Sequence, residues 1–126
     1  MKRILVIDDE PIVRTSCMRA LQYEGYEVML AGSGNEGLDM LNKGSFELVL
    51  LDLKMPDMDG MEVLMKIKEQ WPGTKVVMIT GYSTVETAVQ ALRLGAYNFV
   101  EKPFTPDTLL SAVREVMENS GSRPKE

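Results

Sequence analysis

The stretch Ile4-Leu5-Val6-Ile7-Asp8-Asp9 places two carboxylates directly after four consecutive apolar residues. Three later stretches also end in polar groups: Leu48-Val49-Leu50-Leu51 before Asp52, Val76-Val77-Met78-Ile79 before Thr80-Gly81, and Asn98-Phe99-Val100-Glu101 before Lys102-Pro103. Short apolar runs of this kind are typical of parallel strands buried on both faces. The carboxyl ends of such strands lie at one edge of the sheet, where open α/β sheets bind ligands. The sequence therefore predicts one cleft that contains three carboxylates, a hydroxyl and a lysine.

The segments between these runs have the features of helices. Pro11 suits a first helical turn, and apolar residues then recur at helical spacing up to Gly25. Further helix starts are indicated by capping-box or related patterns at Ser33-Gly34-Asn35-Glu36, Asp59-Gly60-Met61-Glu62, Ser83-Thr84-Val85-Glu86 and Thr105-Pro106. Strand and helix thus alternate along the chain, which predicts βαβ units and a parallel sheet.

The expected strands are residues 4–7, 27–31, 46–52, 75–80 and 98–102, and the second helix is expected to run through Leu41. The second and fifth strands are shorter or more polar than the others, so we expect them at the edges of the sheet. This gives the predicted fold class: α/β, a doubly wound five-stranded parallel sheet that fits the order 2-1-3-4-5, with five helices.

The composition indicates one globular domain without a membrane segment. The chain has 126 residues, of which 44% are hydrophobic, and no apolar run approaches the roughly 20 residues that cross a bilayer. The net charge of -5 argues against direct nucleic-acid contact, which normally needs a basic face. No histidine is present, so histidine metal sites and Ser-His triads are excluded. The single Cys17 cannot form an internal disulfide; we expect it to pack as a small hydrophobe, and we expect a cytoplasmic location.

The three carboxylates of the predicted cleft are Asp8, Asp9 and Asp52. An acid just before a helix is favourable at the positive end of that helix, and this could explain Asp9 alone. It explains neither Asp8 nor Asp52, and three neighbouring carboxylates repel one another. A hard cation such as Mg2+, which takes oxygen ligands and keeps several waters, would relieve that repulsion.

Lys102 and Thr80 each have an ordinary interpretation, as a solvated lysine and as a β-branched strand residue. In the predicted cleft, however, the ammonium and the hydroxyl would face an anion, and Gly81 would leave room for close backbone approach. The Lys102-Pro103 bond is of the kind that can be cis, and the sequence leaves its isomer open.

Four motifs, in this order, resemble the receiver domain of two-component response regulators over essentially the whole chain. They are Val6-Ile7-Asp8-Asp9-Glu10, Leu51-Asp52-Leu53-Lys54-Met55-Pro56-Asp57-Met58-Asp59-Gly60, Ile79-Thr80-Gly81, and Gly95-Ala96 through Glu101-Lys102-Pro103-Phe104. The resemblance implies a flavodoxin-like fold, with residues 1–119 as the receiver domain and 120–126 as a flexible tail or the start of a linker. It also implies a signalling switch rather than an enzyme, phosphorylated by a sensor histidine kinase or a phosphotransfer protein.

The resemblance assigns a role to each residue of the cleft. Asp52 would accept the phosphoryl group and assist in binding Mg2+. Asp9 would bind Mg2+ directly and Asp8 largely through water, and the backbone carbonyl of Lys54 would be a further ligand. Lys102 would pair with the phosphoryl oxygens.

The resemblance also implies a conformational switch. Thr80 would turn its hydroxyl toward the phosphate, and Phe99 would move into the space that it leaves, whereas Tyr97 is expected to pack. The surface of the fourth helix, fifth strand and fifth helix would then change, and a homodimer could form through it. The side chains of Lys54 and Tyr82 would border the phosphoryl group, with Tyr82 shielding it from water; the alternative is that both are simply exposed.

Two other function classes compete with a phosphorylation switch, and whether the receiver is attached to an output domain is a separate question. A Mg2+-dependent phosphatase with an aspartyl-phosphate intermediate usually has a second acid two residues after its nucleophile, where this chain has Lys54, and also an inserted cap. A receiver-like interaction module that takes no phosphate typically lacks one of the cleft residues, and all are present here. The stretch from Gly95 to Phe104 looks more like receivers attached to transcription activators than like the chemotaxis type; a stand-alone receiver is the alternative.

Overall fold

The computed structural model describes residues 2–81 and 84–118, which form one parallel sheet covered by helices. The strands are β1 (Arg3–Ile7), β2 (Glu27–Ala31), β3 (Leu48–Asp52), β4 (Lys75–Thr80) and β5 (Asn98–Glu101). The helices are α1 (Pro11–Tyr23), α2 (Gly34–Lys43), α3 (Gly60–Gln70), α4 (Val85–Arg93) and α5 (Pro106–Glu118). All strand pairs are parallel, and their order is β2-β1-β3-β4-β5. The predicted fold class is confirmed.

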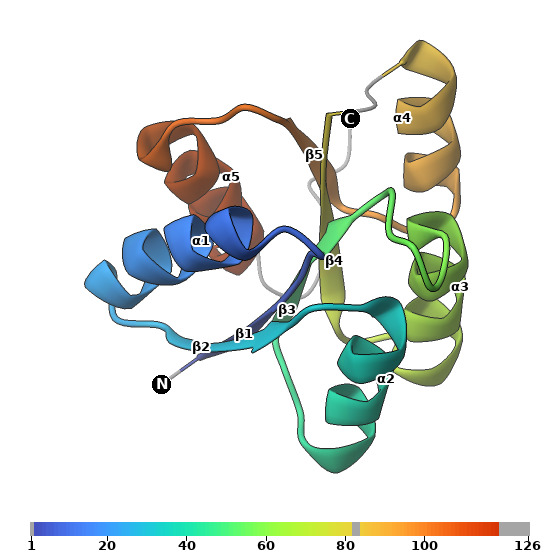
Figure 1. Ribbon diagram of the computed structural model, residues 1–126, viewed down its shortest axis with the longest axis horizontal. Helices are drawn as coiled ribbons and strands as arrows, with labels where there is room; N and C mark the ends of the chain where they lie inside the picture. The colour runs from blue at the N-terminus through green and yellow to red at the C-terminus, as the bar shows by residue number, and fades with distance from the viewer. Residues whose placement is uncertain (1, 82–83, 119–126) are drawn as a thin grey trace.

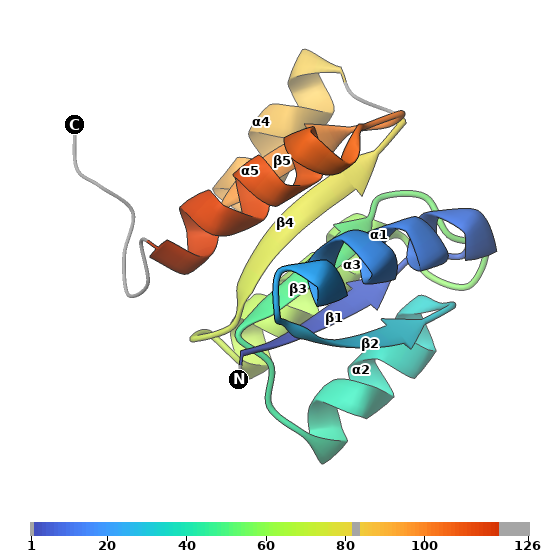
Figure 2. The same cartoon turned by 90° about the vertical axis from the view of Figure 1, so that its left-hand side faces the viewer.

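The sheet lies between two layers of helices. Helices α1 and α5 cover one face, and α2, α3 and α4 cover the other (Figure 1); Figure 2 shows α1 and α5 lying across their face. Alternate residues of β1 enter different cores: Ile4 and Val6 pack on the side of α1 and α5, Leu5 and Ile7 on the other. The central strands are therefore buried on both faces, whereas β2 and β5 are partly exposed edges, as predicted.

Four predicted boundaries are wrong by one or two residues. β1 begins one residue earlier than expected, at Arg3. β3 begins at Leu48 rather than 46, because the carbonyl of Phe46 accepts a hydrogen bond from the Thr74 hydroxyl (3.0 Å) instead of joining the ladder. β5 ends at Glu101, although the amide of Lys102 still donates to Thr80 (2.8 Å). Helix α2 continues past the expected end to Lys43.

Two of the predicted capping boxes differ from the pattern. The Ser33 hydroxyl accepts from the Glu36 amide as expected, but the Glu36 carboxylate accepts from Gly32 (2.7 Å). At α4 the complete box is one residue later than predicted, between Thr84 and Thr87, because the threonine hydroxyls supply both halves. Ser83, the predicted cap, is outside the described residues.

The cysteine and two methionines near the site pack in or against the apolar cores. Cys17 is buried on the side of α1 that packs into the core, and burial raises the pKa of its thiol to about 12, so it packs as an inert hydrophobe. Met55 and Met58 pack against the core on the side of α2 and α3. Among the residues described, no helix combines the length and the apolar character that would let it cross a membrane.

Candidate functional site

A cleft opens at the carboxyl edge of the sheet, where β1, β3 and β5 end. Its volume is about 670 Å3, and its lining is Asp9, Glu10, Asp52, Lys54, Met55, Pro56, Gly81 and Lys102. The parallel register sets Asp52 beside Ile79, and Thr80 beside Glu101. Side chains from distant parts of the chain therefore meet at one place, as the sequence predicted.

The three predicted carboxylates do come together. Asp8, Asp9 and Asp52 each present an oxygen, and these oxygens lie within 4.8 Å of one another. Asp8 is fully buried; its Oδ1 accepts from the Glu10 amide (2.8 Å), while its Oδ2 accepts no hydrogen bond among the described residues. Asp8 thus bonds to the backbone just before α1, which begins after Glu10, and Glu10 makes no side-chain cap.

Burial controls the charge state of these acids. It raises the pKa of Asp52 to about 6; the neighbouring charge of Asp8 adds to this rise, and Lys102 opposes it. Burial also raises the pKa of Asp8, against the opposing effect of Lys102 and the Glu10 amide. Ionising either carboxylate in the folded protein therefore costs more free energy than in water, and positive charge placed in the cleft would lower that cost.

Lys102 is the cation that the structure places among these acids. Its Nζ lies 2.7 Å from Glu10 Oε1, 2.9 Å from Asp8 Oδ2 and 3.3 Å from Asp52 Oδ1. The contact with Asp8 is an ion pair with a fully buried carboxylate. Burial opposes the charge of Lys102, but the close contacts with Glu10 and Asp8 outweigh it and hold the pKa of the ammonium above its usual range. The Lys102–Pro103 peptide bond is cis.

Glu10 is a site residue that the sequence did not single out. It makes the shortest contact with Lys102 (2.7 Å). The two residues are 92 positions apart, so no local pattern could pair them. The available signal was a third consecutive acid, placed where a parallel strand ends.

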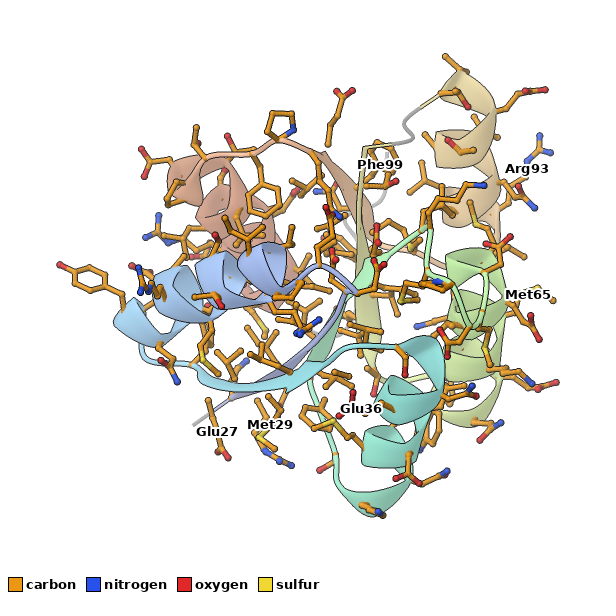
Figure 3. All side chains as sticks on the ribbon, in the orientation of Figure 1. Glu27, Met29, Glu36, Met65, Arg93 and Phe99 are labelled. Carbon is orange, nitrogen blue, oxygen red and sulfur yellow. The ribbon has the colours of Figure 1, made fainter. Side chains whose placement is uncertain are left out.

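The predicted switch residues lie on β4 and β5. Thr80 is fully buried at the end of β4. Phe99 is half-buried and packs on the side of the sheet covered by α2, α3 and α4 (Figure 3). Tyr97 is buried in the opposite core, which confirms that it packs. The Lys54 side chain is exposed beside the cleft, and Tyr82 is outside the described residues.

The donor set of the cleft fits a hard divalent cation. It offers three carboxylates, one of which has a buried oxygen without a hydrogen bond among the residues described. Carboxylate oxygens are the ligands that Mg2+ prefers, together with retained water. The open side of the cleft, lined by Gly81 and the Lys54 segment, leaves room for an incoming anion.

A sequence model of the response regulator receiver domain matches residues 4–114. The chain belongs to this family. Receiver domains act in two-component signalling, where they accept a phosphoryl group. The match covers every strand and helix described, apart from the first residue of β1 and the end of α5.

Individual relatives agree with this assignment. The receiver is 39% identical to a receiver domain protein from Methanospirillum hungatei, with a TM-score of 0.91 and coverage of 95% of this chain and 96% of that one. It is 33% identical to the transcriptional regulatory protein YkoG of Bacillus subtilis and 37% identical to the regulatory protein AtoC of Escherichia coli. These matches include 98% and 94% of this chain. The chain spans about half the length of YkoG (54%) and about a quarter of AtoC (26%).

Proposed function

We propose that Asp52 is the phosphoacceptor of this receiver, and that it takes the phosphoryl group from a phosphohistidine of a partner kinase or phosphotransfer protein. The observation that carries the proposal is the placement of Asp52 at the end of β3, beside two other carboxylates and 3.3 Å from the Lys102 ammonium. Asp8 belongs to the same cluster and lies closer to Lys102 (2.9 Å), but Asp52 lines the cleft and Asp8 does not.

The ionised Asp52 carboxylate is the nucleophile. With a pKa of about 6, most of it is ionised at neutral pH in the absence of metal. One carboxylate oxygen attacks phosphorus, a P–O bond forms and the P–N bond of the phosphohistidine breaks. The electron pair of that bond stays on the imidazole nitrogen. With a proton on the second ring nitrogen of the phosphohistidine, the ring leaves as neutral imidazole, and the other product is an acyl phosphate. Transfer of this kind depends mainly on positioning and charge stabilisation.

The surrounding residues supply that stabilisation. Asp8, Asp9 and Asp52, with the Lys54 carbonyl, would hold Mg2+, whose contribution when bound is positive charge toward the phosphoryl oxygens. Lys102 already contacts Asp52, and it can exchange its Glu10 contact for a phosphoryl oxygen. Thr80 is placed at the end of the adjacent strand, where its hydroxyl can turn toward the same group.

The direct test is intact-protein mass after incubation with acetyl phosphate. We expect a gain of one phosphoryl group with Mg2+ and no gain with EDTA. Without any gain, beryllofluoride binding would separate rapid hydrolysis from loss of function: a receiver that hydrolyses its phosphate quickly still binds this analogue. If the protein neither gains mass with acetyl phosphate nor binds beryllofluoride, the proposal is contradicted and an interaction module is favoured.

We also propose that phosphorylation acts through the surface of α4, β5 and α5, with Thr80 and Phe99 as the switch, and that two copies pair through α4. Helix α4 buries only Ala91, and it exposes Val85, Val89 and Leu92 on its surface. Glu86 stands near one end of this stripe and Arg93 near the other, where it points outward (Figure 3). Antiparallel pairing about a two-fold axis would place Glu86 of one copy near Arg93 of the second, so the stripe is self-complementary.

Sedimentation with and without beryllofluoride checks the pairing. We expect a higher mass in the activated state, a return to monomer for Arg93→Glu, and recovery for the double variant Glu86→Arg with Arg93→Glu. An unchanged monomer mass on activation would rule out this interface.

The relatives suggest the wider role. AtoC and YkoG are described as a regulatory protein and a transcriptional regulatory protein, and we propose that this receiver controls the output of a regulator of the same class. In that role it assists its own phosphorylation and dephosphorylation but is not an enzyme acting on other substrates. The cytoplasmic location and the division into residues 1–119 and a tail stay predictions; residues 119–126 are outside the described part.

A further inference from the structure

The loop between β3 and α3 is closed at its base by a tight approach. The amide of Gly60 donates to the Leu53 carbonyl (2.7 Å). A side chain at residue 60 would collide with the carbonyl of Asp52 and the backbone of Leu53, so only glycine lets α3 begin here. The loop is therefore closed at Leu53 and Gly60. The positions of the residues between them that line the cleft, Lys54, Met55 and Pro56, depend on what fixes the far part of the loop.

That far part is attached to α2 by Asp57. Its Oδ1 accepts from the Gly34 amide (3.1 Å) and its Oδ2 from the Asn35 amide (2.9 Å). The first amides of a helix have no partner within the helix. The next of these, Glu36, is satisfied by the local cap Ser33. The start of α2 is thus capped twice, once by its own sequence and once by a loop more than twenty residues later.

Packing at the same place supports the attachment. Met58 lies so close to Gly34 that an added Cβ there would be 3.2 Å from the Met58 Cβ and 2.9 Å from Val63 Cγ2. Asp57 is exposed, and its slight loss of hydration, which raises its pKa, is outweighed by the hydrogen bonds from Asn35 and Gly34. These bonds lower the pKa of Asp57, so its carboxylate stays charged at neutral pH. Hydrogen bonding and packing therefore hold the loop against α2 together.

We propose that Asp57 is a positioning residue for the metal site: by bonding to the first amides of α2, it holds the loop of residues 53–60 so that the Lys54 carbonyl faces the cleft. This inference rests on the proposed Mg2+ site. Asp57 itself does not line the cleft, so its effect passes through the backbone. Partners that orient a metal ligand typically change metal affinity about 10- to 100-fold when removed.

The test uses Asp57→Ala and Asp57→Asn, which remove two and one of the acceptor oxygens. Mg2+ titrations followed by NMR should give an affinity about 10-fold lower for Asp57→Ala, with a smaller loss for Asp57→Asn. Asp39→Ala is the matched control, because Asp39 is an exposed acid of α2 whose one ion pair within residues 2–81 and 84–118 is with Lys43 across one turn (3.0 Å). It should leave Mg2+ affinity unchanged.

A second measurement needs no metal, so it separates failure of this inference from failure of the proposed function. In EDTA, Asp57→Ala should speed hydrogen exchange at the Gly34 and Asn35 amides and shift the backbone resonances of Lys54 and Met55. If only the α2 amides respond, while Lys54 resonances and Mg2+ affinity stay as in the wild type, Asp57 is merely a helix cap and the inference is wrong. A wild type that binds no Mg2+ would overturn the metal role as well.

Discussion

Asp52→Asn is expected to abolish Mg2+-dependent phosphoryl uptake. The amide has nearly the shape of the carboxylate, but its oxygen is a far weaker nucleophile and its charge is lost. Asp8 and Asp9 remain in the cleft, and if either of them can replace Asp52, uptake will continue in the variant. Intact mass after incubation with acetyl phosphate, compared with wild type in the same buffer, decides this. Uptake at the wild-type level would show that the acceptor is another residue.

The same variant should be more stable than wild type in EDTA. Because burial raises the pKa of Asp52 from 3.8 to about 6, the folded state holds its proton more tightly than the unfolded chain. Ionised Asp52 therefore destabilises the fold above pH 6, by up to about 3 kcal/mol, and this penalty disappears below pH 4. Asparagine never carries the charge.

Urea unfolding of the two proteins at several pH values measures this difference. The advantage of Asp52→Asn should be largest at pH 7–8 and absent near pH 4. Saturating Mg2+ should reduce or reverse it, since ligand binding stabilises the wild-type fold. An advantage independent of pH would mean that the charge of Asp52 is not its source.

Lys102→Met is expected to have the opposite effect on stability. It removes the ammonium from Asp8, Glu10 and Asp52 while keeping similar side-chain length. Breaking a buried ion pair by deleting one partner typically costs about 3–5 kcal/mol, because the other charge is left unpaired. Asp8 is fully buried, so we expect a loss toward this range, limited by the protons that the carboxylates take up.

The pH dependence of unfolding shows whether the stability lost in Lys102→Met comes from its ion pairs with the carboxylates. The raised pKa of Lys102 means that its stabilising contribution is complete below its ordinary pKa and is lost only as pH rises through the raised value. The carboxylates that it pairs with become neutral in acid. The loss for Lys102→Met should therefore be largest from about pH 7 to 9 and should shrink toward pH 4.

Controls separate this effect from a general loss of charge. Lys43→Met breaks an exposed ion pair with Asp39, and such pairs contribute less than about 1 kcal/mol. Adding Asp8→Asn to Lys102→Met should recover part of the lost stability, because the orphaned buried charge is gone. Equal losses for the two lysine variants, or no recovery in the double variant, would contradict the role of Lys102 in balancing the buried acids.

The sequence by itself determined the sheet and the main members of the cleft. Runs such as Leu48 to Leu51 are typical of an interior strand, and in a parallel sheet such a strand delivers Asp52 to the same edge as Asp8 and Lys102. This inference needs only the pattern of side chains along each strand and the parallel arrangement. The cap of α3 at Asp59 was predicted equally well, since Asp59 and the Met61 amide that it accepts from are two residues apart.

Contacts between segments far apart in the chain were decided only by the tertiary structure. Glu10 reaches Lys102, and Asp57 reaches the start of α2, because βα loops from different units converge at the carboxyl edge. Their partners lie 92, 23 and 22 residues away, and no local spacing encodes those distances. The raised pKa of Asp52 was likewise decided only by the tertiary structure. It depends on burial and on neighbouring charges that are brought together only in the folded chain.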